Sequence, residues 1–348
     1  MRPTWLEIDL ARLGDNYRYL RGQLPIRTRM MAVIKADAYG HGAVAVARAL
    51  LELGCRRFAV ATASEGAALR AAGIEAPLHL LGNLHPQEAA EVLAAGLIPT
   101  LASLEPAQAY AALGGKIAHL KIDTGMHRVG VSPADFPSFL ADVEALGIKV
   151  EGIMTHFASS DQDPDFTKLQ LERFLAAAGP YRGGRILHAA NSAALLNWPE
   201  SHLDLVRPGI ALYGLHRHPG LQPILSWQAR ATQFRYLPAG ERVGYGGTYQ
   251  SSGEWMATLP LGYADGFPRG LSSRGWVRLG EQLLPVRGRV SMDQITVTIP
   301  GPLPPEAVFT IAGADYSPAS LSGMAEILDT IPYETVARLS PRLPRVYK

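Results

Sequence analysis

Short apolar runs alternate along the first two thirds of the chain with Ala- and Leu-rich stretches that have helical spacing. The apolar runs are residues 30–35, 57–61, 77–82, 98–103, 117–123, 150–158, 186–192 and 203–214. Many of the stretches between them end at glycine, which is common just past the C-terminus of a helix. Alternating strands and helices predict parallel strands joined by right-handed crossovers.

This number of strand–helix repeats predicts an N-terminal (β/α)8 TIM-type barrel in an α/β protein. A doubly wound open sheet is the alternative, but it usually has fewer strands and a glycine-rich turn after the first one. No G-x-G-x-x-G motif follows residues 30–35. We therefore favour the barrel.

The pattern changes after residue 221. Segments such as "WQARATQFRYL", "EWMATLPLG" and "QITVTIP" alternate apolar and polar positions, with Gly and Pro between them, as half-buried antiparallel strands do. We expect a barrel domain over residues 1–221 and a mostly β C-terminal domain over residues 222–348 that closes with a helical stretch. The first few residues of the chain can also join this second domain.

Composition excludes several classes of protein. The chain has 348 residues, of which 47% are hydrophobic and 18% charged, as is typical of soluble globular proteins. A formal net charge of +2 without a basic run argues against a nucleic-acid partner. The lone Cys55 excludes an intrachain disulfide and a cysteine-based metal site, and we predict no metal. No signal peptide or membrane-spanning run is recognisable, so we expect a cytoplasmic protein without a membrane partner.

Polar residues stand at the carboxyl ends of several predicted strands, which is where barrel enzymes place their chemistry. Taken singly, each has an ordinary structural explanation, such as a strand-end lysine reaching water or a histidine buried in the core. Their shared position at one rim favours a functional site. These residues are Lys35, Asp123, Arg128, His156, Asn191, Ser192, Arg207, Gly209 and Ile210.

The residue types at this rim indicate a particular chemistry. Burial of Lys35 at the end of an apolar strand would lower its pKa and make the amine a Schiff-base former. The loops after strands seven and eight are the usual phosphate site of such barrels. Here they offer the Ser192 hydroxyl and the backbone N–H groups of Gly209 and Ile210. The combination predicts pyridoxal phosphate, or else an aldolase-type carbonyl substrate that bears phosphate. An arginine near the ring would favour the former, because an aldolase substrate has no pyridine nitrogen.

The segment "AVIKADAYGHG" resembles the cofactor-lysine motif of bacterial alanine racemases. Further motifs of that family follow in the same order, and the resemblance covers essentially the whole chain. They are "KIDTGMHRVG" (121–130), "THFASSD" (155–161), "HAANSAAL" (188–195), "RPGIALYG" (207–214), "VGYGGTY" (243–249), "LGYADGFPR" (261–269), "GRVSMDQ" (288–294) and "RLPRVY" (342–347). The resemblance implies a pyridoxal 5'-phosphate barrel with a C-terminal β domain. It also implies a homodimer with shared active sites that interconverts L- and D-alanine and supplies D-alanine for peptidoglycan.

The same resemblance implies roles for individual residues. Lys35 would hold the cofactor covalently and act as one base, and Tyr263, presented by the partner subunit, would act as the other. The remaining matches are Tyr39, Ser192, Gly209 and Ile210 at the phosphate, Arg207 at the pyridine nitrogen with His156 beside it, Asn191 as a further cofactor contact, Arg128 and Met292 at the substrate carboxylate, and Lys121, which some members carry carbamylated against that arginine.

Physical chemistry is consistent with these roles. Racemisation needs a base on each face of a planar carbanion. A tyrosine with a pKa near its reference value of about 10 is a poor base at neutral pH, and a hydrogen bond from His156, itself linked to Arg207, would lower the pKa of Tyr263. An always-protonated arginine against the pyridine nitrogen keeps that nitrogen unprotonated. The weaker electron sink then favours reprotonation over transamination.

The chain departs from the family pattern at Ser291, where many members have cysteine, and at Pro341, where some have a tyrosine near the phosphate. Three alternatives to an alanine racemase stay open. A related racemase would act on serine or a broader range of amino acids. A non-catalytic barrel would only bind pyridoxal phosphate, although a β domain with Tyr263 and Met292 argues against mere carriage. A decarboxylase of the same fold would be expected to pair the ring nitrogen with an acid in place of Arg207.

Overall fold

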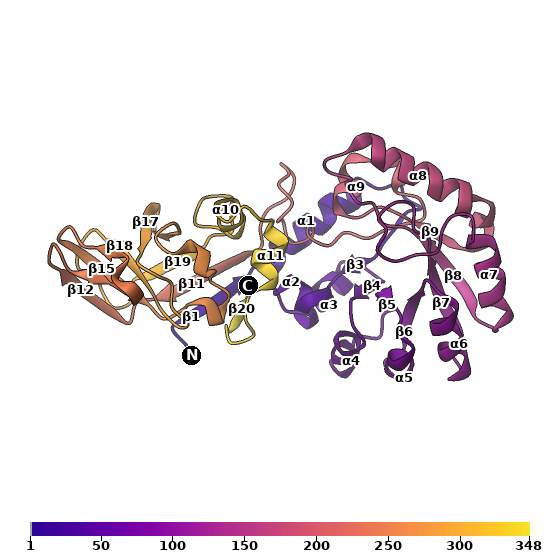
Figure 1. Cartoon of the computed structure of the whole chain (residues 1–348), viewed down its shortest axis with the longest axis horizontal. Coiled ribbons are helices and arrows are strands. Elements are labelled where there is room, and N and C mark those ends of the chain that lie inside the picture. Colours follow the sequence, from indigo (N-terminus) through magenta and orange to yellow (C-terminus); the bar gives the residue numbers. More distant parts are fainter. Residues whose placement is uncertain (1) are drawn as a thin grey trace. The chain divides into compact units, whose positions relative to one another are not determined.

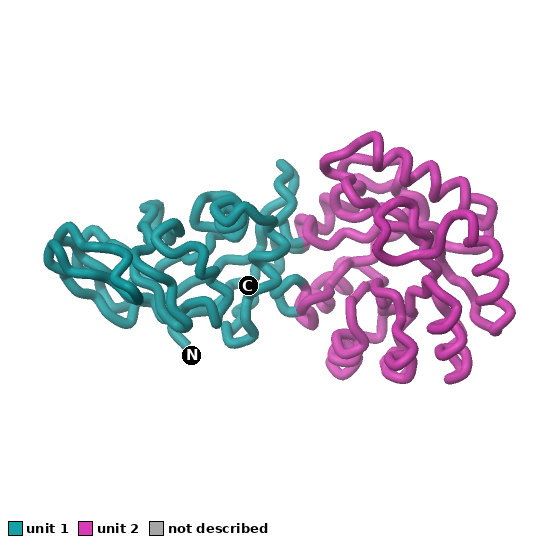
Figure 2. The backbone as a smooth tube through the Cα atoms, in the orientation of Figure 1, with its two compact units in different colours: residues 1–13, 39–42, 213–348 teal, residues 14–38, 43–212 magenta. Residues whose placement is uncertain are grey.

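The computed structural model describes residues 2–348. The chain divides into two compact units (Figure 2). One comprises Gly14–Ala38 and Ala43–Leu212, and the other comprises the residues up to Leu13, Tyr39–Gly42 and Tyr213–Lys348. Each is described by itself below.

The first unit is built on a parallel sheet with helices around it (Figure 1). Its sheet runs in the order β3-β4-β5-β6-β7-β8-β9, and neighbouring strands are parallel throughout. The strands of this unit are β2 (Arg29–Met30), β3 (Ala32–Val33), β4 (Phe58–Val60), β5 (Leu78–Asn83), β6 (Leu97–Leu101), β7 (Ile117–Lys121), β8 (Lys149–Met154), β9 (Ile186–His188) and β10 (Leu205–Val206).

The short strand β10 closes this sheet into a barrel. It pairs in parallel with β2, and the Val33 N–H donates to the Pro208 carbonyl at 2.9 Å. On the other side, the Arg207 N–H donates to the carbonyl of Ala190, just beyond β9, at 2.9 Å. Every strand overlaps an apolar run of the sequence. The predicted parallel α/β barrel is therefore confirmed, and the open-sheet alternative is wrong.

The helices of this unit follow the strands as the glycine pattern predicts. Gly54, Gly73 and Gly96, which stand just beyond α3, α4 and α5, all have positive φ, the conformation that glycine adopts at a helix end. The helices are α1 (Leu10–Gly22, which begins in the other unit), α3 (Ala43–Glu52), α4 (Ala63–Ala71), η1 (Pro86–Glu88), α5 (Ala89–Ala94), α6 (Leu104–Ala112), α7 (Phe136–Ala145), α8 (Pro164–Ala178), η2 (Gly179–Gly184), α9 (Ser192–Asn197) and η3 (Pro199–Ser201).

The second unit is mostly β, as predicted. Its main sheet has the order β12-β15-β18-β17-β16-β19-β11-β1-β20. The strands are β1 (Thr4–Ile8), β11 (Leu225–Arg230), β12 (Gln233–Leu237), β13 (Arg242–Val243), β14 (Tyr249–Gln250), β15 (Glu254–Leu259), β16 (Trp276–Leu279), β17 (Gln282–Arg287), β18 (Ile295–Ile299), β19 (Val308–Ala312) and β20 (Arg345–Tyr347). Trp227 is fully buried in this unit, and its ring N–H donates to the Thr4 hydroxyl at 2.7 Å.

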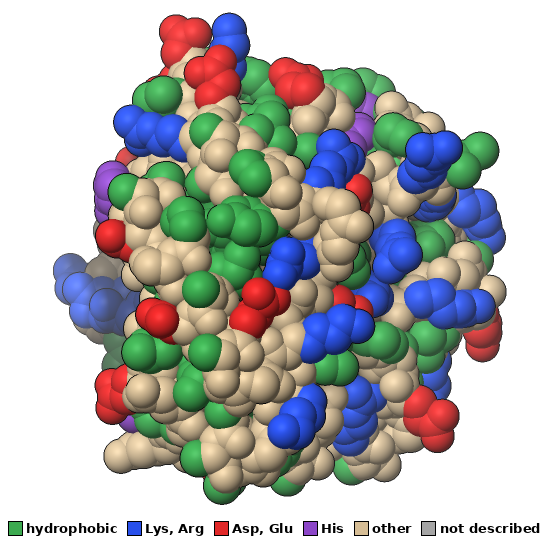
Figure 3. All heavy atoms as spheres, turned by 90° about the vertical axis from the view of Figure 1, so that its right-hand side faces the viewer, with side chains coloured by type: hydrophobic (Ala, Val, Ile, Leu, Met, Phe, Trp, Pro, Cys, Tyr) green, Lys and Arg blue, Asp and Glu red, His purple; other side chains and the backbone are tan. Residues whose placement is uncertain are grey.

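The remaining elements of this unit are short helices. The predicted helical stretch near the C-terminus is α10 (Leu321–Ile327) followed by α11 (Pro332–Ala337), and the 3-10 turns are η4 (Tyr245–Gly247), η5 (Tyr263–Asp265) and η6 (Arg269–Leu271). No helix within residues 2–348 is long and apolar enough to cross a membrane. On the face that the space-filling view shows, lysine and arginine side chains are most frequent on one half, with a few acidic side chains among them (Figure 3).

Candidate functional site

The chain leaves the first barrel strand through a left-handed turn. Element α2 (Lys35–Tyr39) carries φ values of 52°, 53° and 54° at Ala36, Asp37 and Ala38, and Tyr39 also has positive φ. Each L-residue in this conformation costs about 1–2 kcal/mol relative to the right-handed helix. Such strain persists where surrounding contacts over-determine the backbone, as they do at many functional sites.

Two carboxylates hold this turn. Glu65 of α4 accepts the Ala36 N–H at 2.7 Å with one oxygen and the Ala61 N–H at 2.8 Å with the other. Asp37 accepts the Ala43 N–H at 2.8 Å, at the start of α3. The backbone on the carboxyl side of Lys35 is therefore fixed from both neighbouring helices.

The lysines at this rim are shifted toward their neutral forms. Burial lowers the pKa of Lys35, and the positive charge of Arg128 lowers it further. Burial, with the charges of Arg207 and Arg128, lowers the pKa of Lys121 to about 8. The neutral amine is the form that attacks carbonyl carbon, and a lowered pKa favours that form in both lysines.

Arg207, directly after β10, is buried and held from several strands. Its guanidinium donates to the Thr155 carbonyl at 2.7 Å, to the Ala189 carbonyl at 2.9 Å and to Nδ1 of His188 at 2.8 Å. Nδ1 of His156 lies 3.4 Å from the same guanidinium. Burial and the charge of Arg207 lower the pKa of both histidines, so they are neutral beside a fixed cation.

The loops after β9 and β10 form a cradle of hydrogen-bond donors. Ser192 Oγ accepts the N–H groups of Gly209 and Ala211 at 2.9 and 3.3 Å. Within residues 2–348 neither the Ser192 hydroxyl hydrogen nor the Ile210 N–H has an acceptor. Buried donors without acceptors are rare in proteins. This cradle therefore fits a phosphate group.

Asn191 supports the cradle from the preceding position. Its side-chain oxygen accepts the Ala194 N–H at 3.0 Å as the N-cap of α9 and the Ser160 hydroxyl at 2.9 Å. The Trp198 ring N–H in turn donates to the Ser160 carbonyl at 3.2 Å. These contacts fix the orientation of the Asn191 side chain and the start of α9.

Three of the expected site residues belong to the second unit. Tyr39 is buried there, with its ring centroid 5.1 Å from that of Tyr213 and 6.1 Å from that of Tyr333. Tyr263 and Met292 are 45% and 52% exposed. The barrel unit holds the other expected residues, namely Lys35, Lys121, Arg128, His156, Asn191, Ser192, Arg207, Gly209 and Ile210.

Tyr263 and Met292 are exposed, but the backbone that carries them is well fixed. The Tyr263 N–H donates to the Ser291 carbonyl at 3.1 Å, and the Ala264 N–H donates to the Met292 carbonyl at 3.1 Å. A Cβ atom at Gly262 would lie 2.2 Å from the Ser291 oxygen, so only glycine permits this approach. The result is a tyrosine held on a firm turn with its side chain accessible.

Sequence reasoning missed a group of polar residues inside the barrel. His188 Nε2 lies 2.8 Å from His119 Nδ1, and His119 Nε2 lies 3.1 Å from Glu151. Arg57 pairs with Glu151 at 2.8 Å and also contacts His79 Nε2 at 3.1 Å. The sequence did contain a signal for this group, since each of three apolar runs includes one histidine: "PLHLLG", "IAHLKID" and "ILHAANS".

The ligand atoms of His79, His119 and Glu151 all lie within 4.8 Å of one another, close enough for a metal ion. The guanidinium of Arg57, however, already contacts both Glu151 and His79. A cation is thus supplied by the chain itself. The geometry favours an ion pair here over a metal centre.

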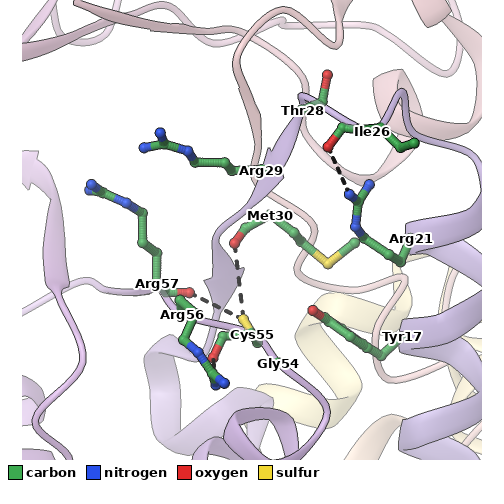
Figure 4. Close-up of a pocket in the computed structure, with 10 residues that line it drawn as sticks. All are labelled: Tyr17, Arg21, Ile26, Thr28, Arg29, Met30, Gly54, Cys55, Arg56 and Arg57. Atoms are coloured by element: carbon green, nitrogen blue, oxygen red, sulfur yellow. Dashed lines mark hydrogen bonds between the residues drawn. The ribbon is translucent and has the colours of Figure 1, made fainter.

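A cavity of about 410 Å³ lies near the amino ends of β2 and β4 (Figure 4). Four arginines line it, and the side chains of Arg29 and Arg57 extend to the same side in this view. Arg21 donates to the Ile26 carbonyl, Arg56 turns to the Leu51 carbonyl, and Arg57 points away toward Glu151. Three of the four lining arginines are therefore engaged with acceptors of the chain itself.

Together, the barrel, the half-buried Lys35 at its rim, the donor cradle and the buried Arg207 define a pyridoxal-phosphate-binding barrel enzyme. The sequence matches the family model for the alanine racemase N-terminal domain over residues 8–217 and that for the C-terminal domain over residues 224–347. The chain belongs to the alanine racemase family, and it is a pyridoxal-phosphate-dependent isomerase.

Curated relatives match along their full length. The chain is 40% identical to the alanine racemase of Halothermothrix orenii over 368 residues, covering 100% of this chain and 97% of that protein. It is 42% identical to the alanine racemase of Symbiobacterium thermophilum over 373 residues, with the same coverage of 100% and 97%.

Solved structures agree in fold. The alanine racemase of Clostridium difficile 630 superposes with a TM-score of 0.93 at 32% identity, covering 100% of this chain and 96% of that one. The alanine racemase of Bartonella henselae with covalently bound pyridoxal phosphate gives a TM-score of 0.90 at 30% identity, covering 100% of both chains. The open alternatives of a decarboxylase and of a non-catalytic cofactor carrier are therefore set aside.

Proposed function

We propose that Lys35 and Tyr263 are the two bases with which this alanine racemase moves the α-proton of alanine. Lys35 acts on one face of the substrate, and Tyr263 of the partner subunit acts on the other. The observation that carries this proposal is the contrast between the two side chains. Lys35 is half-buried with a lowered pKa, whereas Tyr263 is 45% exposed on a fixed turn.

The barrel rim would hold the cofactor. Lys35 would bind it covalently, and Ser192, Gly209 and Ile210 would donate to its phosphate, with Tyr39 and Asn191 as further contacts. Arg207 would face the pyridine nitrogen beside His156, and the always-protonated guanidinium would keep that nitrogen unprotonated. When bound, pyridoxal phosphate withdraws electrons from the α-carbon of the amino acid, so that the α-proton becomes acidic.

The substrate would be oriented by its carboxylate. Arg128 offers a guanidinium at the rim, which suits bidentate recognition of a carboxylate, and Met292 would add a main-chain contact. Lys121 would be carbamylated against Arg128. Its pKa of about 8 supports this, because carbon dioxide reacts with the neutral amine.

The enzyme would work as a homodimer with shared sites, and its D-alanine would supply peptidoglycan. Two-fold symmetry makes an exposed residue of one protomer available to the same site of its partner. Tyr263 and Met292 are exposed on two segments of the second unit that backbone hydrogen bonds join, as residues that serve a partner subunit must be in the isolated chain.

Mixing inactive variants tests this arrangement. Lys35→Ala and Tyr263→Phe proteins are each expected to be inactive as racemases. If the site is shared, unfolding and refolding them together restores about a quarter of wild-type activity, because half of the dimers are hybrid and each hybrid has one intact site. Mixtures that stay inactive, while each variant alone is folded and dimeric, would refute the shared site.

A further inference from the structure

A chain of hydrogen bonds runs through the barrel from the cofactor rim toward the amino ends of the strands. Arg207 at the rim contacts His188 at the end of β9, and His188 contacts His119 in the middle of β7. His119 contacts Glu151, near the start of β8, and Glu151 is paired with Arg57 just before β4. A buried polar chain of this length is costly unless every member is satisfied.

The direction of every hydrogen bond in this chain follows from its ends. A guanidinium only donates, so Nδ1 of His188 must accept from Arg207 at 2.8 Å. His188 then carries its hydrogen on Nε2 and donates to Nδ1 of His119 at 2.8 Å. His119 likewise carries its hydrogen on Nε2 and donates to Glu151 at 3.1 Å. A carboxylate only accepts, so the pattern closes without conflict.

Burial supports the same protonation pattern. Burial lowers the pKa of His188 and of His119, so each imidazole is neutral and has one hydrogen to place. The His119 hydrogen bond and the Arg57 guanidinium hold the pKa of Glu151 below its usual range. Glu151 is therefore the anion that ends the chain.

The barrel also leaves room for this arrangement. A Cβ atom at Gly152 would lie 2.5 Å from the His119 ring, nearer than packing allows. Glycine at this position lets the His119 ring reach between Glu151 and His188. The strand residue next to Glu151 thus has a reason to be glycine that is independent of the hydrogen bonds.

We infer that Glu151 and His119 are positioning residues for Arg207, acting from inside the barrel through His188. They fix the hydrogen of His188 on Nε2, which leaves Nδ1 free to accept from Arg207. If that hydrogen moved to Nδ1, it would oppose the guanidinium, and Arg207 would lose one of the contacts that aim it. Since Arg207 would face the pyridine nitrogen, the inference rests on the proposed function.

Histidine tautomers can be read directly by nitrogen NMR of protein labelled at its histidines. In the cofactor-free protein, His188 and His119 are expected to carry hydrogen on Nε2. His79 is expected to show the opposite tautomer, because Arg57 donates to its Nε2. His202, whose Nε2 donates to the Leu195 carbonyl at 2.7 Å, calibrates the spectrum. A charged His188, or one with hydrogen on Nδ1, would overturn the inference whether or not the proposed function holds.

A matched pair of variants tests the consequence for catalysis. His119→Gln can still accept from His188 and donate to Glu151, whereas His119→Leu can do neither. We expect His119→Leu to lose the single Nε2 tautomer of His188 and to lower kcat about tenfold with little change in KM, as loss of a partner behind a ligating histidine does in metal sites. His119→Gln should keep the tautomer and most of kcat.

Two further outcomes separate the inference from the proposed function. If His119→Leu changes the His188 tautomer but leaves kcat unchanged, the chain does not position Arg207 for catalysis and the inference fails. The proposed function is tested separately, by mixing the Lys35→Ala and Tyr263→Phe proteins and measuring racemase activity. Equal loss of kcat in His119→Gln and His119→Leu would also contradict the inference. Only His119→Leu removes both the acceptor for His188 and the donor to Glu151.

Discussion

The carboxylate of Glu65 accepts the N–H of Ala36 at 2.7 Å, across 29 positions of the sequence. This contact ties helix α4 to the residue that follows Lys35. It helps to hold Ala36, Asp37 and Ala38 in the left-handed conformation. Lys35 is therefore positioned by a strained turn, and contacts with the neighbouring helices hold that turn in place.

Replacement of Ala36 by glycine is expected to stabilise the protein. Ala36 is exposed and has a φ of 52°, which glycine adopts without the cost of about 1–2 kcal/mol that an L-residue bears. We expect Ala36→Gly to raise the free energy of unfolding by about 1 kcal/mol in urea titrations. Ala67→Gly, at an exposed position in the middle of the right-handed helix α4, should instead lower it by about 0.5–1 kcal/mol. Shifts of the same sign would argue against the left-handed turn.

Removal of the Ser192 hydroxyl tests the cradle. Ser192 Oγ accepts two backbone N–H groups in a buried loop, and leaving such donors unsatisfied costs about 1–3 kcal/mol. We expect Ser192→Ala to lose stability in this range in the cofactor-free protein and to bind the cofactor more weakly in equilibrium dialysis. Ser132→Ala removes a comparable but exposed contact with the Asp135 N–H, and its effect should stay within about 0.5 kcal/mol.

Acid should reveal the charge of Glu151. Its pKa is held below the usual range by the hydrogen bond from His119 and by Arg57. A depressed carboxyl pKa contributes stability that is present above its unfolded pKa of about 4.3 and is lost as the pH falls below that value. The stability advantage of wild type over Glu151→Gln should therefore shrink between pH 6 and pH 3 on denaturant titration.

The exposed ion pair of Glu144 with Arg185 offers the matched control. Exposed pairs contribute little, so Glu144→Gln should differ from wild type by a small amount that changes little with pH. An advantage over Glu151→Gln that stays constant with pH would mean that Glu151 is not held as an anion.

Lys121 should take up carbon dioxide in a pH-dependent manner. Its pKa of about 8 means that the neutral, reactive amine becomes the major form as the pH rises through that value. With labelled bicarbonate, the carbamate signal in carbon NMR should be weak at pH 6 and grow toward pH 9. Lys121→Arg should abolish that signal, and replacement of the exposed Lys149 should leave it unchanged. A signal that survives Lys121→Arg would place the carbamate elsewhere.

The strand content of the barrel could be predicted because its strands are buried on both faces and read as continuous apolar runs. The left-handed turn could not, since "ADAY" contains no glycine and its conformation depends on Glu65 and Asp37. Strand β20 (Arg345–Tyr347) was also missed, because it is short and depends on pairing with β1 at the other end of the sequence.

The positions of the rim residues could be predicted because most of them lie within an apolar run, toward its carboxyl end, and the carboxyl ends of barrel strands gather at one rim. The buried chain behind Arg207 was not, because His119 and His188 stand inside those runs and a single buried histidine looks like any core residue. Only the structure shows that these histidines lie 2.8 Å apart, between Arg207 and Glu151, whose contacts set the direction of the hydrogen bond between them. The roles of the expected site residues, Lys35 and Tyr263 included, and the domain boundary at residue 221 stay predictions.

The central claim is that this chain racemises alanine with two bases on opposite faces. Purified protein with L-alanine in deuterated water, followed by proton NMR and chiral separation over the first turnovers, tests it most directly. We expect the D-alanine formed to carry deuterium at the α-carbon while the remaining L-alanine keeps its proton. D-alanine that retains the proton would contradict the two-base account. Absence of any α-proton exchange from a protein that binds the cofactor would contradict racemase activity itself.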